Sequence, residues 1–240
     1  MTLIYGHRGA RGEAPENTLA SFEACLKAGV NRCELDLQLS KDGQLMVIHD
    51  ASLKRTTGLR GKVSQHSAEQ LMQMDARHNT VPWPTVCPIP SLEQLFSLCP
   101  FEHWQLEVKE ASRSRSAHIV RAIDQLSARF ALQDKIIITS SSRTVLRAAK
   151  RLTPHLARGL VAEYAWLDPI KVALRYNCQM LVLNWALSTE QRLAKAQQAG
   201  LHVSVWTVNE PALMRRLAAC GADSLITDFP GLAIATLGNH

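Results

Sequence analysis

Short apolar segments that alternate with amphipathic ones limit the fold of this chain more than any other feature. The segment 135–139 (KIIIT) is almost continuously apolar, and helical periodicity follows it over residues 144–152. Strands of this kind occur where helices cover a parallel sheet. The alternation continues to the end of the chain and therefore predicts an α/β fold built on a parallel sheet.

The expected barrel strands surround Ile4, Glu34, Leu106, Ile137, Leu160, Val182, Val205 and Ile226. Polar residues stand at the ends of nearly all of them. This distribution is typical of a (β/α)8 TIM barrel, whose active site lies at the carboxyl ends of the strands. A doubly wound open sheet is the alternative, but it gathers its ligand-binding residues at one crevice. We expect a single barrel domain over residues 1–240.

Residues 51–90 interrupt the alternation. They contain a helix-like stretch at 68–74 and a proline-rich stretch at 82–90. The segment is too small to fold alone. We therefore expect an insertion after the second barrel strand that caps the mouth of the barrel.

Polar motifs accompany the expected strands. In chain order they are His7-Arg8-Gly9, Pro15-Glu16-Asn17-Thr18, Glu34-Leu35-Asp36, His49-Asp50, Glu107-Val108-Lys109 and Trp206-Thr207-Val208-Asn209. Two imidazoles, several carboxylates and fixed positive charges suit the metal-assisted cleavage of a phosphate ester.

The spacing around Asp42-Gly43 predicts a β-hairpin, because this dipeptide is a strong hairpin-turn signal. A two-residue turn there pairs Asp36 with His49 on the returning strand. Directly opposed residues share one face of the sheet. The local pattern alone therefore places His49 beside Glu34 and Asp36, whereas a longer turn shifts this register.

Three carboxylates, Glu34, Asp36 and Glu107, stand at the ends of expected barrel strands. Like charges that converge repel one another unless a cation or protons compensate them. Oxygen ligands without cysteine favour Mg²⁺ or Ca²⁺ over Zn²⁺. A buried ion network with Arg8, Lys109 and Arg32 explains the pattern equally well.

The overall composition argues against several other classes of protein. The net charge is +6, but the basic residues are dispersed, so we expect no nucleic-acid partner. No window holds the ~20 apolar residues of a membrane-spanning helix. The six cysteines are scattered, and no signal peptide precedes the first expected strand, so we expect free thiols and a cytoplasmic location.

Taken in order, the motifs resemble those of the glycerophosphodiester phosphodiesterase family, over almost the whole chain. The resemblance implies metal-dependent hydrolysis of glycerophosphodiesters to sn-glycerol 3-phosphate and an alcohol, with Glu34, Asp36 and Glu107 as ligands of Mg²⁺ or, alternatively, Ca²⁺. It assigns acid-base catalysis to His7 and His49, without deciding which is the acid. It also implies a small-molecule substrate, and the oligomeric state stays open.

Four further residues are candidates for substrate binding. Arg8 and Lys109 carry positive charge for the phosphate oxygens, or neutralise the carboxylates. Glu16 either lines the pocket or helps to cap the first helix, and Trp206 either lines the glycerol site, as in relatives, or belongs to the barrel core. Arg77 and Ser140–Ser142 depart from the family pattern and leave the headgroup open. Lysophospholipase D activity and a non-catalytic phosphate- or metal-binding barrel are the alternative functions.

Overall fold

The computed structural model describes residues 2–80, 82–109, 111–164 and 167–238. In these residues, eight strands run parallel and close into a barrel, because β1 pairs with both β2 and β9. The barrel strands are β1 (Leu3–His7), β2 (Arg32–Leu39), β4 (His103–Val108), β5 (Ile136–Ser140), β6 (Ala157–Ala162), β7 (Met180–Asn184), β8 (His202–Trp206) and β9 (Ser224–Thr227). The predicted TIM barrel is confirmed, and the open-sheet alternative is wrong.

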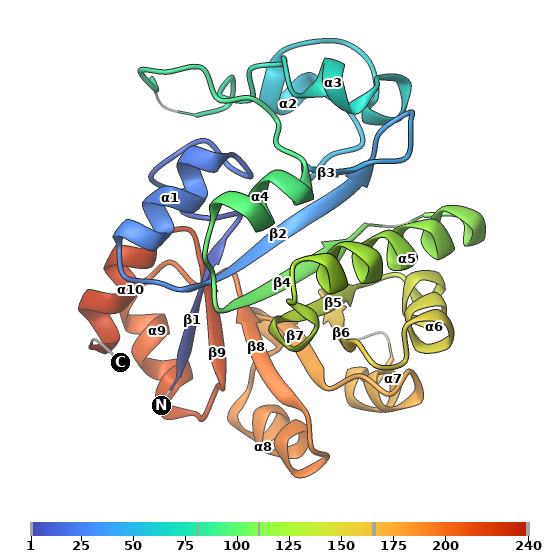
Figure 1. Ribbon diagram of the computed structural model, residues 1–240. Helices are drawn as coiled ribbons and strands as arrows, with labels where there is room; N and C mark the ends of the chain where they lie inside the picture. The colour runs from blue at the N-terminus through green and yellow to red at the C-terminus, as the bar shows by residue number, and fades with distance from the viewer. Residues whose placement is uncertain (1, 81, 110, 165–166, 239–240) are drawn as a thin grey trace.

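Helices surround the barrel on its outer side (Figure 1). They are α1 (Leu19–Lys27), α4 (Leu92–Leu98), α5 (Arg113–Arg129), α6 (Arg143–Leu152), α7 (Pro169–Arg175), α8 (Glu190–Gln198), α9 (Pro211–Ala219) and α10 (Pro230–Leu237), with short 3₁₀ turns at Gln133–Lys135 and Trp185–Leu187. In α6, Val145, Leu146 and Ala149 are buried against the sheet while Arg147 is exposed. No helix among the described residues combines the length and apolar character needed to cross a membrane.

Side chains alternate between two cores along each strand. On β4, Leu106 and Val108 point outward into the layer beneath the helices, whereas Gln105 and Glu107 point into the barrel. A smaller apolar cluster, which includes Tyr5, Ile137 and Val182, fills the barrel interior. This inner cluster forms the floor beneath the carboxyl ends of the strands.

The hairpin between β2 and β3 (Leu45–Val47) has a longer turn than the two-residue one that we predicted. Leu37 pairs with Val47 and Leu39 with Leu45, which leaves a five-residue connection closed by a hydrogen bond from Ser40 N–H to the Gln44 carbonyl. Gly43 occupies the left-handed region at φ 82°. A glycine there is typical of three-residue hairpin loops. The pairing of Asp36 with His49 is therefore wrong, because Ile48 N–H donates to the Asp36 carbonyl at 3.0 Å.

The segment that follows the hairpin lies beyond the carboxyl ends of the barrel strands (Figure 1). It contains α2 (Lys54–Thr57), a 3₁₀ turn (Val63–Gln65) and α3 (Ala68–Leu71). A separate apolar cluster packs it against β3 and includes Met46, Ile48, Leu53, Val63, Leu71 and Ile89. The segment rejoins the barrel beside its starting point, since Val47 N–H donates to the Pro90 carbonyl at 2.9 Å.

Candidate active site

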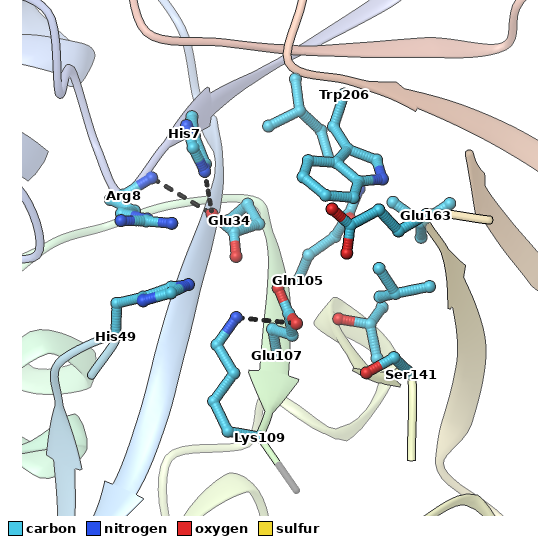
Figure 2. A pocket seen from close by; sticks show the side chains of 14 residues that line it. His7, Arg8, Glu34, His49, Gln105, Glu107, Lys109, Ser141, Glu163 and Trp206 are labelled. Atoms are coloured by element: carbon cyan, nitrogen blue, oxygen red, sulfur yellow. Dashed lines mark hydrogen bonds and ion pairs between the residues drawn. The ribbon is translucent and has the colours of Figure 1, made fainter. Parts of the chain in front are cut away.

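A cavity of about 220 Å³ opens at the carboxyl ends of the barrel strands. Most of the motif residues surround it (Figure 2). Its lining consists of His7, Arg8, Glu34, His49, Gln105, Glu107, Lys109, Thr139, Ser141, Val161, Glu163, Val182, Trp206 and Ile226. Polar groups from the first half of the chain thus face a partly apolar wall from the second half.

Strand pairing brings the three predicted metal ligands together. β2 carries Glu34 and Asp36 on one face, and Asp36 lies beside Glu107 of β4 in the parallel register. Oxygen atoms of the three carboxylates all lie within 4.8 Å of one another. Glu34 and Asp36 are buried, and Glu107 is partly buried. Three carboxylates this close need positive charge between them.

Two cations approach Asp36 from opposite sides. Lys109 Nζ lies 2.7 Å from Asp36 Oδ1 and 2.7 Å from Glu107 Oε1, while Arg8 Nε lies 3.0 Å from Asp36 Oδ2. Burial disfavours ionisation of Asp36, but Lys109 and Arg8 outweigh it and hold its pKa far below the usual range. Two members of the ion network that the sequence suggested as an alternative, Arg8 and Lys109, are thus present around Asp36, whereas Arg32 forms no ion pair with these carboxylates among the described residues.

Glu34 is not neutralised in the same way. Its Oε2 accepts the Arg8 backbone N–H at 3.2 Å, but Oε1 is buried and has no hydrogen-bond partner among the described residues. Burial raises the pKa of Glu34 well above its ordinary value, and the charges of Asp36 and Glu107 raise it further. An unpartnered carboxylate oxygen beside two more carboxylates is the donor set that Mg²⁺ or Ca²⁺ prefers. The residues therefore fit a hard divalent cation.

A tight turn after β1 presents Arg8 to these carboxylates. Gly9 has φ 84°, and a Cβ atom there would lie 2.5 Å from the backbone of Ser21. Ser21 Oγ accepts the Ala10 N–H at 2.8 Å and donates to the Arg8 carbonyl at 2.8 Å. Only glycine avoids both the strain and this contact, which explains its place after the histidine and arginine.

His7 ends β1 and is buried, with 6% of its surface exposed. Its Nδ1 lies 2.6 Å from Asp228 Oδ1, and its Nε2 faces Glu34 Oε2 at 3.9 Å. Burial lowers the pKa of His7, and the Asp228 hydrogen bond only partly opposes this. With Nδ1–H donated to the carboxylate, the lone pair of Nε2 points toward the cavity.

His49 approaches the same cavity from the hairpin side, although it does not pair with Asp36. Gln38 Nε2 donates to its carbonyl at 3.0 Å, and its Nδ1 lies 2.6 Å from Asp50 Oδ1. Asp50 in turn accepts from Arg55 Nε at 2.6 Å. Both predicted catalytic histidines therefore lie against an aspartate. The motifs pointed to a role for neither aspartate, although Asp50 is adjacent to His49 and Asp228 directly follows an expected strand.

Glu16 lies behind Arg8 rather than on the cavity wall. Its carboxylate accepts from Arg8 Nη1 at 2.8 Å and from both Nη atoms of Arg55 at 2.7 and 2.8 Å. The pKa of Glu16 is lowered to about 2, because these two guanidinium groups outweigh the effect of burial. Thr18, and not Glu16, caps α1. Glu16 thus connects the turn after β1 to the segment above the barrel.

The rest of the cavity lining includes Trp206, which the motifs identified as a candidate, and Gln105, Ser141 and Glu163, to which they assigned no role. Trp206 lines the cavity from β8, whereas Gln105, Ser141 and Glu163 line it from β4 and from the ends of β5 and β6. Gln105, Ser141 and Glu163 are each separated by two positions from another cavity residue on the same segment, so strand alternation would have revealed them. Asn184, by contrast, caps the 3₁₀ turn Trp185–Leu187 and does not line the cavity.

Comparisons with known proteins agree with this geometry. The profile of the Glycerophosphoryl diester phosphodiesterase family matches residues 7–232. A glycerophosphodiester phosphodiesterase of Caldanaerobacter subterraneus is 30% identical, with 95% of each chain covered. The structure of a glycerophosphodiester phosphodiesterase from Agrobacterium tumefaciens is similar, with a TM-score of 0.83 at 25% identity, over 98% of this chain and 100% of that one. An Oleispira antarctica phosphodiesterase in complex with the product sn-glycerol-3-phosphate has a similar fold, with a TM-score of 0.88 at 24% identity, over 99% and 97% of the two chains.

Proposed function

This chain belongs to the glycerophosphoryl diester phosphodiesterase family, and we propose that it hydrolyses glycerophosphodiesters to sn-glycerol 3-phosphate and an alcohol, with the help of a divalent cation. One observation carries the proposal: two aspartate-paired histidines face a group of three carboxylates across one cavity. The product held by the Oleispira protein supports the identity of the phosphate-containing product.

Glu34, Asp36 and Glu107 would hold the cation, and Mg²⁺ is the ion that we propose, with Ca²⁺ as the alternative. A divalent cation at this position would offset the negative charge of the phosphodiester and the further negative charge that develops on its oxygens during the reaction. Lys109 and Arg8 complete the positive surroundings of the phosphate. Arg8 is held in place by Glu16 and Asp36, so Glu16 acts through Arg8.

We assign the general base to His7 and the general acid to His49. Burial favours the neutral form of His7, so its Nε2 can take the proton from the attacking hydroxyl, of water or of the substrate's glycerol, as that oxygen bonds to phosphorus. Attack by the glycerol hydroxyl gives a cyclic phosphate, which water then opens to the monoester. His49 Nε2 then donates a proton to the alkoxide oxygen as its bond to phosphorus breaks. Asp228 and Asp50 hold the two rings in the tautomer that this exchange requires.

We further propose that residues 1–240 work as one domain, in which residues 51–90 cap the barrel mouth. Arg55 of α2 supports this arrangement, because it binds Glu16 at the barrel and Asp50 beside His49. Trp206 would contact the organic part of the substrate next to the apolar wall.

A coupled assay of glycerol 3-phosphate release across a panel of headgroups tests this function. We expect release from glycerophosphodiesters, its loss in EDTA and its recovery with Mg²⁺. Full activity in a rigorously metal-stripped sample would contradict the cation and favour the ion network. Release of lysophosphatidate from lysophospholipids, without hydrolysis of the water-soluble diesters, would instead indicate a lysophospholipase D.

A further inference from the structure

Glu163 extends the cavity wall beyond the end of β6. Val161 and Glu163 are separated by two positions and both line the cavity, whereas Ala162 between them packs into the outer core. The side chain of Glu163 reaches into the cavity from the wall opposite His49 and Arg8 (Figure 2). It is exposed, so its carboxylate is available to a molecule in the cavity.

Glu163 differs from the other carboxylates of the cavity in its surroundings. Among the described residues, its carboxylate forms no ion pair, and it accepts a hydrogen bond from the Tyr164 hydroxyl at 3.1 Å. The other cavity carboxylates differ, because Glu107 contacts Lys109 and Glu34 belongs to the group that fits a metal. A phosphodiester is itself an anion. An unpaired carboxylate in its binding cavity therefore opposes binding, unless the substrate also carries a positive charge.

The surroundings of Glu163 suit such a charge. Trp206 lines the same cavity and is seen on the side of Glu163, away from His49 (Figure 2). Val161, Val182 and Ile226, which belong to the apolar cluster at the floor, add apolar surface to the cavity lining. A carboxylate, an aromatic ring and aliphatic side chains together attract an ammonium group that carries carbon substituents.

We propose that Glu163 and Trp206 form a subsite for an ammonium group on the leaving alcohol. The enzyme would then prefer zwitterionic glycerophosphodiesters, such as those with a choline or ethanolamine headgroup, over diesters with an uncharged headgroup. This inference rests on the proposed hydrolysis of glycerophosphodiesters and names the class of headgroup that the same cavity selects.

A pair of isosteric substrates isolates the effect of charge. Glycerophosphocholine and the 3,3-dimethylbutyl ester of glycerol 3-phosphate have headgroups of nearly the same shape, but only the first carries a positive charge. We expect wild-type kcat/KM to favour the choline ester about tenfold, mainly through KM. In Glu163→Gln this preference should fall close to one, and raising the salt concentration should reduce it in the wild type only. Glu210→Gln, the same substitution at an exposed glutamate outside the cavity, is the matched control and should keep the preference.

The outcomes of this experiment separate the ammonium subsite from the proposed hydrolysis. Equal wild-type rates on both esters, or an unchanged preference in Glu163→Gln, would overturn the ammonium subsite while leaving the proposed hydrolysis intact. A uniform loss on both esters in Glu163→Gln would place Glu163 at the shared glycerol end and also overturn the subsite. Hydrolysis of neither ester by the wild type, with metal present, would contradict the proposed function itself.

Discussion

His7 and Asp228 are 221 positions apart, yet His7 Nδ1 and Asp228 Oδ1 lie at 2.6 Å. They meet because β1 pairs with β9 and closes the barrel, which brings the ends of both strands to the same edge. Asn209 Nδ2 donates to the other carboxylate oxygen at 2.8 Å. The carboxylate is thus fixed on both sides, and it fixes the ring of His7.

Asp228→Asn should lower kcat by at least ~10²-fold with little change in the melting temperature. The amide can donate to Nδ1, which favours the tautomer with a proton on Nε2 and removes the lone pair that a base needs. Steady-state kinetics with a melting curve measures both effects. Normal kcat in this variant would show that Asp228 has no role in orienting His7.

The two histidines should respond differently to the leaving group. His49→Ala should lower kcat at least ~10²-fold on glycerophosphocholine, since the choline alkoxide needs a proton. On a 4-nitrophenyl ester, whose leaving group is stable without a proton, His49→Ala should retain most of its activity. His7→Ala should be impaired on both substrates. The reverse pattern would exchange the roles of acid and base.

Lys109→Met should lower kcat by ~10²- to 10³-fold at saturating metal, as the loss of a preorganised charge does. Burial disfavours the charged form of Lys109, but Asp36 and Glu107 outweigh it and raise its pKa. The ammonium group is therefore positively charged at all working pH values. Kinetics at increasing Mg²⁺ separates two roles: if kcat recovers fully at saturation, Lys109 only balances the carboxylates.

His103, at the start of β4, should make the fold sensitive to mild acid. Burial lowers its pKa from 6.5 to about 4, and the positive charge of Arg32 contributes. A pKa that is lower in the folded state gives stability that is present above pH 6.5 and is lost as pH falls toward 4. Between pH 7 and pH 5 the loss from this group should be about 2 kcal/mol.

Urea unfolding at the two pH values measures this loss. The ring of His103 contacts Tyr5, with 2.9 Å between Nδ1 and the hydroxyl oxygen. His103→Gln can keep a hydrogen bond to Tyr5 but does not titrate in this range. The variant should therefore lose less stability between pH 7 and pH 5 than the wild type, and parallel losses would assign the acid sensitivity to other groups.

Much of the barrel was predictable because each strand can be recognised from its own local sequence. Each apolar run is buried on both faces, so residues such as Ile137 and Val182 mark strands without knowledge of their neighbours. The hairpin register was not predictable in the same way. It depends on Gly43 adopting a left-handed conformation after Asp42, and the same dipeptide also fits the shorter turn.

Contacts between distant segments were the part of the site that the sequence predicted least well. The partnership of His7 with Asp228 depends on barrel closure, and that of Glu16 with Arg55 depends on how residues 51–90 fold over the barrel. No local pattern encodes either distance. Glu163 could have been predicted from the sequence, because it is the next inward-facing position after Val161.

The hydrogen bond between Val47 N–H and the Pro90 carbonyl has a consequence for how this enzyme can be altered. The chain leaves β3 and returns to it at nearly the same place, so the two ends of residues 51–90 lie close together. Because the entropy of closing such a loop grows slowly, doubling its length costs only about 0.6 kcal/mol. The length of this segment can therefore change at little cost in stability, provided that Arg55 keeps its contacts with Glu16 and Asp50.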